Sequence, residues 1–269
     1  MTDRATEPSP TALLDLALSA ARQAGDLLRA GLDSGPAVVE SKTTRTDLVS
    51  DLDRASEKLI LEVLAAARPD DSVLAEEGSD RTGSSRVRWV IDPLDGTVNY
   101  VYGLPVFAVS IAAEIDGVVV AGVVHDPSRG ETFTGLLGSG SWLNGRPLVV
   151  NSPPELSMSL VGTGFAYDAL VRRVQGAAMS EILGRVRDIR RAGSAALDLC
   201  AVAAGRLDAY FERGTRHWDR AAGALIAREA GAVVGDLHGP EPTDQLVMAV
   251  APSVAAAFRE LLADVGAQN

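Results

Sequence analysis

The longest apolar stretch of the chain begins at Val106 and constrains the fold more than any other segment. Glu114 and Asp116 interrupt it, which is incompatible with a membrane-spanning helix of about 20 apolar residues. The dipeptide Asp116-Gly117 tolerates positive φ angles and is typical of tight hairpin turns. We therefore expect two strands, over 107–115 and 118–125, that pair antiparallel around this turn.

Helical and extended patterns alternate along the rest of the chain, and Asn144-Gly145 marks another hairpin turn. A helix containing Leu59 and Ile60 is expected to have Asp53 as its N-cap, and a strand over 86–91 is expected to stop before Asp92-Pro93. The other expected elements are helices over 11–30, 169–184, 194–205 and 219–230, and strands over 186–189, 207–212 and 232–234. This pattern predicts a mixed α/β fold with layers of helix and sheet.

Neither a repeat of 20–50 residues nor a Pro/Ser-rich linker divides the sequence. We expect one domain over 1–269, with residues 1–10 flexible and two subdomains over about 11–150 and 151–265.

The charge balance of the chain limits its partners and its location. It has 25 Lys and Arg against 36 Asp and Glu, a net charge of −11, which argues against a groove for nucleic acid. Cys200 is the one cysteine, so an internal disulfide is impossible and a reducing compartment is favoured. The first ten residues, MTDRATEPSP, lack the pattern of an export signal. We expect a cytoplasmic protein that does not enter membranes.

Carboxylates are the chemically suggestive residues of this sequence. The nucleophile-elbow, P-loop, dinucleotide-binding and C-x-x-C motifs are absent, and the three histidines are scattered. Three acidic clusters follow expected strands or open expected helices: Asp92 with Asp95, Glu76-Glu77, and Asp219. Each alone has an ordinary explanation as a turn, a solvated loop or a helix cap. Together they indicate a site for hard divalent cations with oxygen ligands.

At these residues the sequence resembles a known family. The segment WVIDPLDGTVNYVYGLPVFAVSIA is similar to the motif D-P-[IL]-D-G-T-x-N-[FY] of the inositol monophosphatase family, and HWDRAAGALIAREAGAVV to its second motif. LAEEG matches the family's G-E-E, and the similarity runs in order from about Ala20 to Val250. Ala75 and Ala232 stand where the family usually has glycine. The resemblance implies a layered αβαβα sandwich, usually a homodimer.

The resemblance also implies a set of metal ligands. Glu76, Asp92 and the backbone carbonyl of Leu94 would hold one Mg²⁺, and Asp92, Asp95 and Asp219 a second. A third, weaker ion would also contact Glu76, and Mn²⁺ is a possible substitute for Mg²⁺. Such cations would make an acidic cavity attractive to a phosphate dianion.

Catalytic roles follow from the same resemblance. Glu76 and the Thr97 hydroxyl would orient the attacking water and take up its proton, and the Gly96 and Thr97 amides would hold phosphate oxygens. Asp53 resembles a family acid that orients metal-bound water without binding the metal itself, and Lys42 would add positive charge nearby. A helix cap and a surface lysine explain these last two residues equally well.

The resemblance also implies that the substrate is a small phosphorylated polyol. Besides Gly96 and Thr97, the substrate-binding residues would be Asp95, Glu212, Asp219 and the backbone of Gly193, Ser194 and Ala195. Inositol 1-phosphate is the first candidate, and histidinol phosphate and fructose 1,6-bisphosphate are alternatives within the family. A hypothesis of another class is a regulatory partner of the transcription machinery.

Overall fold

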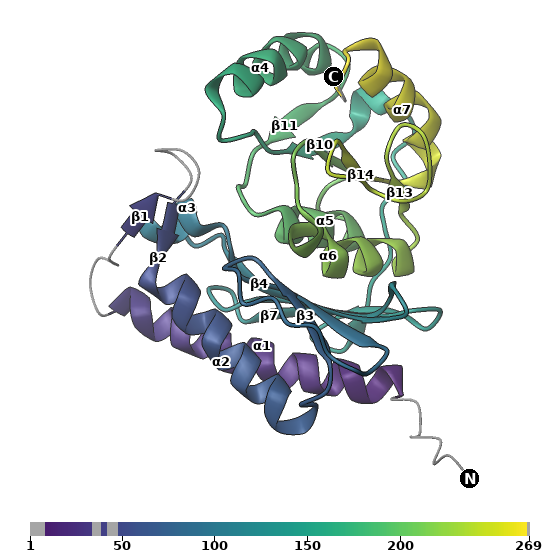
Figure 1. Cartoon of the computed structure of the whole chain (residues 1–269). Coiled ribbons are helices and arrows are strands. Elements are labelled where there is room, and N and C mark those ends of the chain that lie inside the picture. The colour runs from purple at the N-terminus through teal and green to yellow at the C-terminus, as the bar shows by residue number, and fades with distance from the viewer. Residues whose placement is uncertain (1–8, 34–38, 42–47, 268–269) are drawn as a thin grey trace.

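The structure is a computed structural model and describes residues 9–33, 39–41 and 48–267. Helices and sheets alternate in five layers, which Figure 1 shows from bottom to top. Two sheets lie between three pairs of helices: α1 (Pro10–Asp33) with α2 (Asp51–Ala67), α5 (Ala195–Ala203) with α6 (His217–Glu229), and α4 (Ala169–Leu183) with α7 (Ala255–Asp264). The expected αβαβα sandwich is confirmed.

The lower sheet has seven strands and is a meander apart from its first strand. In spatial order the strands are β3 (Ser72–Ala75), β4 (Val87–Asp95), β5 (Ala108–Ile115), β6 (Val118–Asp126), β7 (Glu131–Leu136), β8 (Gly140–Leu143) and β9 (Arg146–Pro147). Only β3 and β4 run parallel. The turn residues Asp116 and Gly117 have φ angles of 51° and 82°, and Asn144 and Gly145 have 49° and 79°. Both predicted hairpin turns are therefore confirmed.

The upper sheet has five strands and mixed pairing. In spatial order they are β11 (Asp188–Arg190), β10 (Leu160–Thr163), β12 (Ala209–Glu212), β14 (Val247–Val250) and β13 (Val233–Gly235). Strand β10 is parallel to both of its neighbours, and β14 is antiparallel to both of its own. The strands predicted over 186–189, 207–212 and 232–234 are present with ends shifted by one or two residues.

Helix α2 begins differently from the prediction. The short strands β1 (Val39–Ser41) and β2 (Leu48–Ser50) precede it, and its N-cap is Ser50 rather than Asp53. The Ser50 amide donates to the Asp53 carboxylate over 2.8 Å, and the Ser50 hydroxyl accepts from the Asp53 amide over 3.3 Å. Asp53 is therefore the third residue of a capping box, and its carboxylate is fully buried.

Two further element ends differ from the prediction. Strand β4 continues beyond Ile91 to Asp95. Its pairing with β5 joins Asp92 to Ser110 and Asp95 to Ala108, and it skips Pro93 and Leu94. This bulge accommodates a proline that lacks an N–H donor. Helix α6 begins at His217, two residues before Asp219, and the Asp219 carboxylate accepts the Arg216 amide over 2.6 Å.

Small residues let the central helices lie close to the lower sheet. A Cβ atom at Gly122 of β6 would lie 3.0 Å from the Cα of Ala222 and 3.1 Å from its carbonyl oxygen. Cys200 of α5 is fully buried in the same central layer. The core therefore depends on tight helix-to-sheet contact.

Within residues 9–33, 39–41 and 48–267, no helix combines the length and apolar character needed to cross a membrane.

We predict that Gly122→Ala lowers the free energy of unfolding by about 1–3 kcal/mol, because the added methyl group overlaps the α6 backbone. Urea denaturation of the two proteins measures the difference. Gly176→Ala on α4 is the matched control, since a Cβ atom at that position would have no neighbouring heavy atom within 4 Å. That control should leave stability unchanged or raise it by about 0.5–1 kcal/mol. Equal effects of the two substitutions would contradict the packing argument.

Candidate active site

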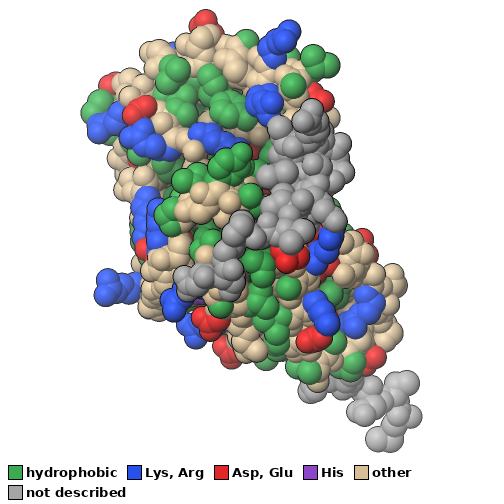
Figure 2. All heavy atoms as spheres, turned by 90° about the vertical axis from the view of Figure 1, so that its left-hand side faces the viewer, with side chains coloured by type: hydrophobic (Ala, Val, Ile, Leu, Met, Phe, Trp, Pro, Cys, Tyr) green, Lys and Arg blue, Asp and Glu red, His purple; other side chains and the backbone are tan. Residues whose placement is uncertain are grey.

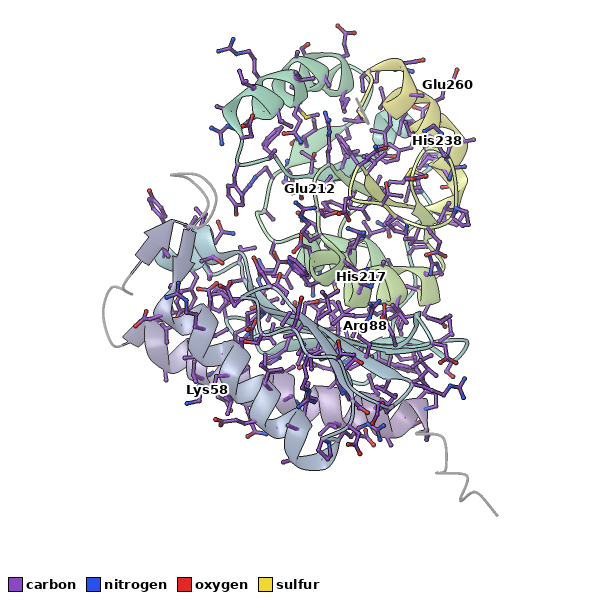
Figure 3. All side chains as sticks on the ribbon, viewed as in Figure 1. Lys58, Arg88, Glu212, His217, His238 and Glu260 are labelled. Carbon is purple, nitrogen blue, oxygen red and sulfur yellow. The ribbon has the colours of Figure 1, made fainter. Side chains whose placement is uncertain are left out.

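A cavity of about 730 Å³ opens between the two halves of the chain. It lies where β4 and β12 end and where α5 and α6 begin. Ten of the predicted site residues line it together: Glu76, Asp92, Leu94, Asp95, Gly96, Thr97, Gly193, Ala195, Glu212 and Asp219. Figure 3 labels Glu212, which lies at the lower edge of the upper sheet. The predicted residues Asp53 and Ser194 bond to this lining from behind, whereas Lys42 lies outside the described residues.

The bulged end of β4 is held from both sides. The Leu94 amide donates to Asp92 Oδ1 over 3.0 Å, which fixes the direction of that carboxylate. From α2, the Ser56 hydroxyl donates to the Pro93 carbonyl oxygen over 2.8 Å. Asp92 is buried and Leu94 fully so. The bulge therefore presents Asp92 and the Leu94 backbone to the cavity as a rigid unit.

The residues after the bulge connect the cavity to a buried acid. Gly96 has a φ of 97°, and a Cβ atom there would lie 2.9 Å from the Val106 carbonyl oxygen, so glycine is required. Thr97 opens the short helix α3 (Thr97–Val101). Its hydroxyl lies 2.9 Å from Asp53 Oδ1 and 3.0 Å from the Leu94 carbonyl oxygen, and either oxygen can accept its single hydrogen. Burial raises the pKa of Asp53 to about 6. The Thr97 hydroxyl therefore connects the cavity wall to a buried carboxylate.

Asp95 joins the two halves of the chain. Its Oδ2 accepts the Ser194 hydroxyl over 2.6 Å and the Ala196 amide over 2.7 Å, both from the start of α5. Nearby, the Asn99 side-chain amide donates to the Ala192 carbonyl over 2.9 Å. Burial raises the pKa of Asp95 to about 6, against the opposing effect of the α5 hydrogen bonds.

Glu76 lies in a loop that α2 holds in place. The backbone amide of Glu77 donates to Glu57 Oε2 over 2.8 Å, and Glu57 is itself buried. Before the loop, the Ala75 amide donates to Asp80 Oδ1 over 2.9 Å. Alanine in place of the family's usual glycine therefore leaves Glu76 on the cavity wall.

Neighbouring carboxylates raise the pKa of Asp92 and of Asp219. Burial raises the pKa of Asp92 well above its usual range, and the neighbouring charges of Glu76 and Asp95 raise it further. Burial and the charge of Glu76 act in the same direction on Asp219. A group of acids that repel one another in this way attracts cations or protons.

Glu212 lies apart from this group, at the end of β12. Its Oε2 accepts the Tyr210 hydroxyl over 2.7 Å, and burial raises the pKa of Glu212 to about 7. The charge of Arg191, which also lines the cavity, partly opposes that shift. Glu212 can therefore either donate or accept a hydrogen bond near neutral pH.

A model of the Inositol monophosphatase family matches residues 9–267. The chain belongs to this family. The predicted resemblance is therefore confirmed, and membership supports a metal-dependent phosphatase.

Individual relatives carry two kinds of name. Inositol-1-monophosphatase of Mycobacterium leprae is 46% identical over 236 residues, which cover 84% of this chain and 81% of that protein. Nus factor SuhB of Escherichia coli is 41% identical over 232 residues, which cover 84% and 86%. The solved structure of Mycobacterium tuberculosis SuhB has a TM-score of 0.83 and 39% identity, and the match covers 98% of this chain and 100% of that one. The sandwich is thus the fold of this family.

The residues present fit hard divalent cations. Glu76, Asp92, Asp95, Asp219 and the Leu94 backbone line the cavity as oxygen donors, the type that Mg²⁺ prefers. Among the described residues, no three acidic, histidine or cysteine side chains are already gathered into a closed metal-binding group. The donors therefore surround the cavity and do not form a ready-made cage.

The sequence analysis did not identify several residues that line the cavity. The lining also includes Arg191, Arg213, Thr215, Arg216 and Asp244. A signal for three of them was present, since two arginines and a threonine directly precede the HWD segment.

An ion-pair network around the buried Glu114, beneath α6, was also missed. His217 Nε2 lies 2.6 Å from Glu114 Oε1, and Arg88 Nε donates to Glu114 Oε2 over 2.5 Å. Figure 3 labels His217 and Arg88, which lie on either side of the junction between α6 and the lower sheet. Glu114 is only 1% exposed. This network anchors the first turn of α6, two residues from Asp219.

We predict that Glu114→Gln lowers the free energy of unfolding at pH 7 by about 2 kcal/mol, because a buried charge-assisted acceptor is lost. Burial alone would raise the Glu114 pKa, but His217 and Arg88 together lower it below its ordinary 4.5. The stabilisation is therefore present above pH 4.5 and is lost as the pH falls through the folded-state pKa.

Urea denaturation at pH 7 and at pH 4 measures this difference, which should narrow at the lower pH. Glu62→Gln, at an exposed pair with Lys58, is the control and should change stability little at either pH. A difference between parent and Glu114→Gln that widens at pH 4 would refute the assignment.

Proposed function

We propose that this protein hydrolyses phosphate monoesters of small polyols, inositol 1-phosphate first among them, in a reaction that requires Mg²⁺. The observation that carries the proposal is the group of four buried or half-buried carboxylates, Glu76, Asp92, Asp95 and Asp219, that line the same cavity. The raised pKa values of Asp92, Asp95 and Asp219 favour cation binding, and bound cations would admit a phosphate dianion.

The proposed metal ligands are divided between two ions. Glu76, Asp92 and the Leu94 carbonyl would hold one, and Asp92, Asp95 and Asp219 the other, so that Asp92 is shared. A third, weaker ion would contact Glu76. When bound, these ions would supply positive charge for the phosphate and increase the acidity of a water molecule.

The chain's own groups would position the reactants. Glu76 and the Thr97 hydroxyl would orient the attacking water, and the buried Asp53 carboxylate would receive its proton through Thr97 over the 2.9 Å hydrogen bond. The backbone amides of Gly96 and Thr97 would hold phosphate oxygens.

The alcohol part of the substrate would face the other half of the chain. Glu212 and the backbone of Gly193, Ser194 and Ala195 would bind its hydroxyls, together with Asp95 and Asp219. The Ser194 side chain is already engaged by Asp95, so the backbone of this residue is what we assign to substrate. Histidinol phosphate and fructose 1,6-bisphosphate are the alternative substrates.

A regulatory role in transcription is a second candidate, because the Escherichia coli relative is named a Nus factor. We further propose that the chain is a single catalytic unit in the cytoplasm and pairs as a homodimer. A pull-down with Asp92→Asn separates the two functions, since partner binding should survive the loss of hydrolysis.

A phosphate-release panel on the purified protein tests the proposed activity. We expect turnover of inositol 1-phosphate that exceeds that of histidinol phosphate and fructose 1,6-bisphosphate. Activity should vanish in excess chelator, return with Mg²⁺ or Mn²⁺, and fall with Ca²⁺, which tolerates looser coordination. Full activity in chelator would refute the metal-dependent reaction.

We predict that Asp92→Asn lowers kcat by about 10³-fold, because it removes one negative charge from both proposed ion sites while preserving shape. Mg²⁺ should also raise the melting temperature of the parent more than that of the variant. Asp15→Asn, on the exposed face of α1, is the control. Near-parental turnover and an unchanged Mg²⁺ effect in Asp92→Asn would exclude the bridging role.

A further inference from the structure

Arg220, which follows Asp219 in the first turn of α6, has an unusual environment for an arginine. On the face that Figure 2 shows, Lys and Arg side chains are common at the surface of the upper half. Arg220 is instead only 7% exposed, and among the described residues it is the single buried arginine or lysine. A buried guanidinium is costly unless its charge is paired and its donors are bonded. The partners of Arg220 therefore matter for the start of α6.

Two segments of the chain meet at this guanidinium group. Arg220 Nη1 donates to the Thr215 carbonyl oxygen over 2.5 Å, within the segment between β12 and α6. Arg220 Nη2 donates to Asp244 Oδ1 over 2.9 Å, within the loop that joins β13 to β14, the strands that Figure 1 shows above α6. Arg220 therefore ties both segments to the helix.

Asp244 also bonds directly to the segment before α6. Its Oδ2 accepts Arg216 Nη1 over 3.0 Å, and its backbone carbonyl accepts the Gly214 amide over 3.1 Å. Burial acts to raise the pKa of Asp244, but the hydrogen bonds from Arg220 and Arg216 lower it, so the carboxylate is charged at neutral pH. We refer to the pair Arg220 and Asp244 as the clasp.

The clasp acts on the peptide unit that orients Asp219. The Arg216 amide donates to Asp219 Oδ2 over 2.6 Å, so this oxygen already has a partner and Oδ1 is left for a cation. The Thr215 carbonyl and the Arg216 amide belong to one peptide unit, and a peptide unit is planar. Because Arg220 holds the carbonyl of this unit, it also fixes the direction of the N–H group that Asp219 accepts.

We propose that the clasp holds the peptide after Thr215 so that Asp219 keeps the orientation needed to bind a divalent cation. Arg220 and Asp244 are thus positioning residues that do not bind the ion themselves. The inference rests on the proposed function, because it concerns one of the proposed metal ligands. Removing a hydrogen-bonded group behind a metal ligand typically lowers metal affinity by about 10–100-fold.

The effect expected for Arg220→Gln is opposite to the effect of charge alone. The substitution removes a positive charge beside Asp219, which by itself would strengthen cation binding. Loss of the clasp should weaken it instead. Calorimetric titration of the purified, chelator-treated protein with Mn²⁺ measures this without substrate. We expect Arg220→Gln to raise the half-saturating Mn²⁺ concentration about 10-fold.

Asp244→Ala provides a second variant, because the Asp244 side chain is 54% exposed and is not part of the core. It should also raise the half-saturating Mn²⁺ concentration about 10-fold. In an Asp219→Asn background, Arg220→Gln and Asp244→Ala should each change Mn²⁺ binding by less than about 2-fold, because the ligand that they position is already altered. An effect of charge alone would persist in that background. Melting curves in chelator establish that each variant is folded.

Arg228 and Glu241 supply matched controls with the same changes of charge. Arg228 Nη2 lies 3.4 Å from Glu241 Oε1, so this pair joins the same helix to the same loop, but neither residue lines the cavity. Arg228→Gln and Glu241→Ala should leave Mn²⁺ binding within about 2-fold of the parent.

Kinetics distinguish positioning from general damage. Saturating Mg²⁺ should restore kcat of the clasp variants to within about 2-fold, whereas the Mg²⁺ concentration for half-maximal activity should rise about 10-fold. If no phosphate monoester is hydrolysed while the Mn²⁺ difference persists, the proposed function fails and the clasp stands. Unchanged or tighter Mn²⁺ binding in Arg220→Gln, or an equal effect of Asp244→Ala with and without Asp219→Asn, overturns the clasp.

Discussion

The hydrogen bonds from the start of α5 to the Asp95 carboxylate connect the two halves of the molecule at the cavity. Asp95 ends a strand of the lower sheet, whereas Ser194 and Ala196 precede and open a helix of the central layer. Asn99 repeats the connection one turn later through the Ala192 carbonyl. Because these bonds fix α5 against β4, they also set how far Glu212 lies from the acidic group. Together with the close packing of α6 on the lower sheet at Gly122, this junction sets the width of the cavity.

Helix α2 supports the site with residues that a core helix would usually not bury. Ser50, Asp53, Ser56 and Glu57 are all buried, and each holds a different part of the cavity wall or the helix cap. Further along the same helix, Ile60 and Leu64 are buried against the sheet instead. The first half of the buried face thus positions the cavity wall, and the second half stabilises the fold. A buried polar network of this kind is costly unless every member is paired.

Local signals explain most of what could be predicted from the sequence. The Asp116-Gly117 turn needs only positive φ angles, and the helix that follows Ser194 needs only a cap, so neighbouring residues determine both. The metal ligands were proposed through motif order, which brings together residues as distant as Glu76 and Asp219. The extension of β4 through Pro93 could not be predicted, because it depends on pairing with β5. Contacts such as Glu114 with His217 join residues 103 positions apart and leave no local pattern.

Because Cys200 is buried, the reaction rate of its thiol depends on how often the central layer opens. The thiol lies in α5 between the two sheets and is fully buried, and burial raises its pKa well above the usual range. A thiol in that state reacts slowly, because the thiolate is the nucleophile. Any reagent that modifies it must wait until the central layer separates from a sheet. The rate of that modification therefore reports how often the sandwich opens, without any substitution in the chain.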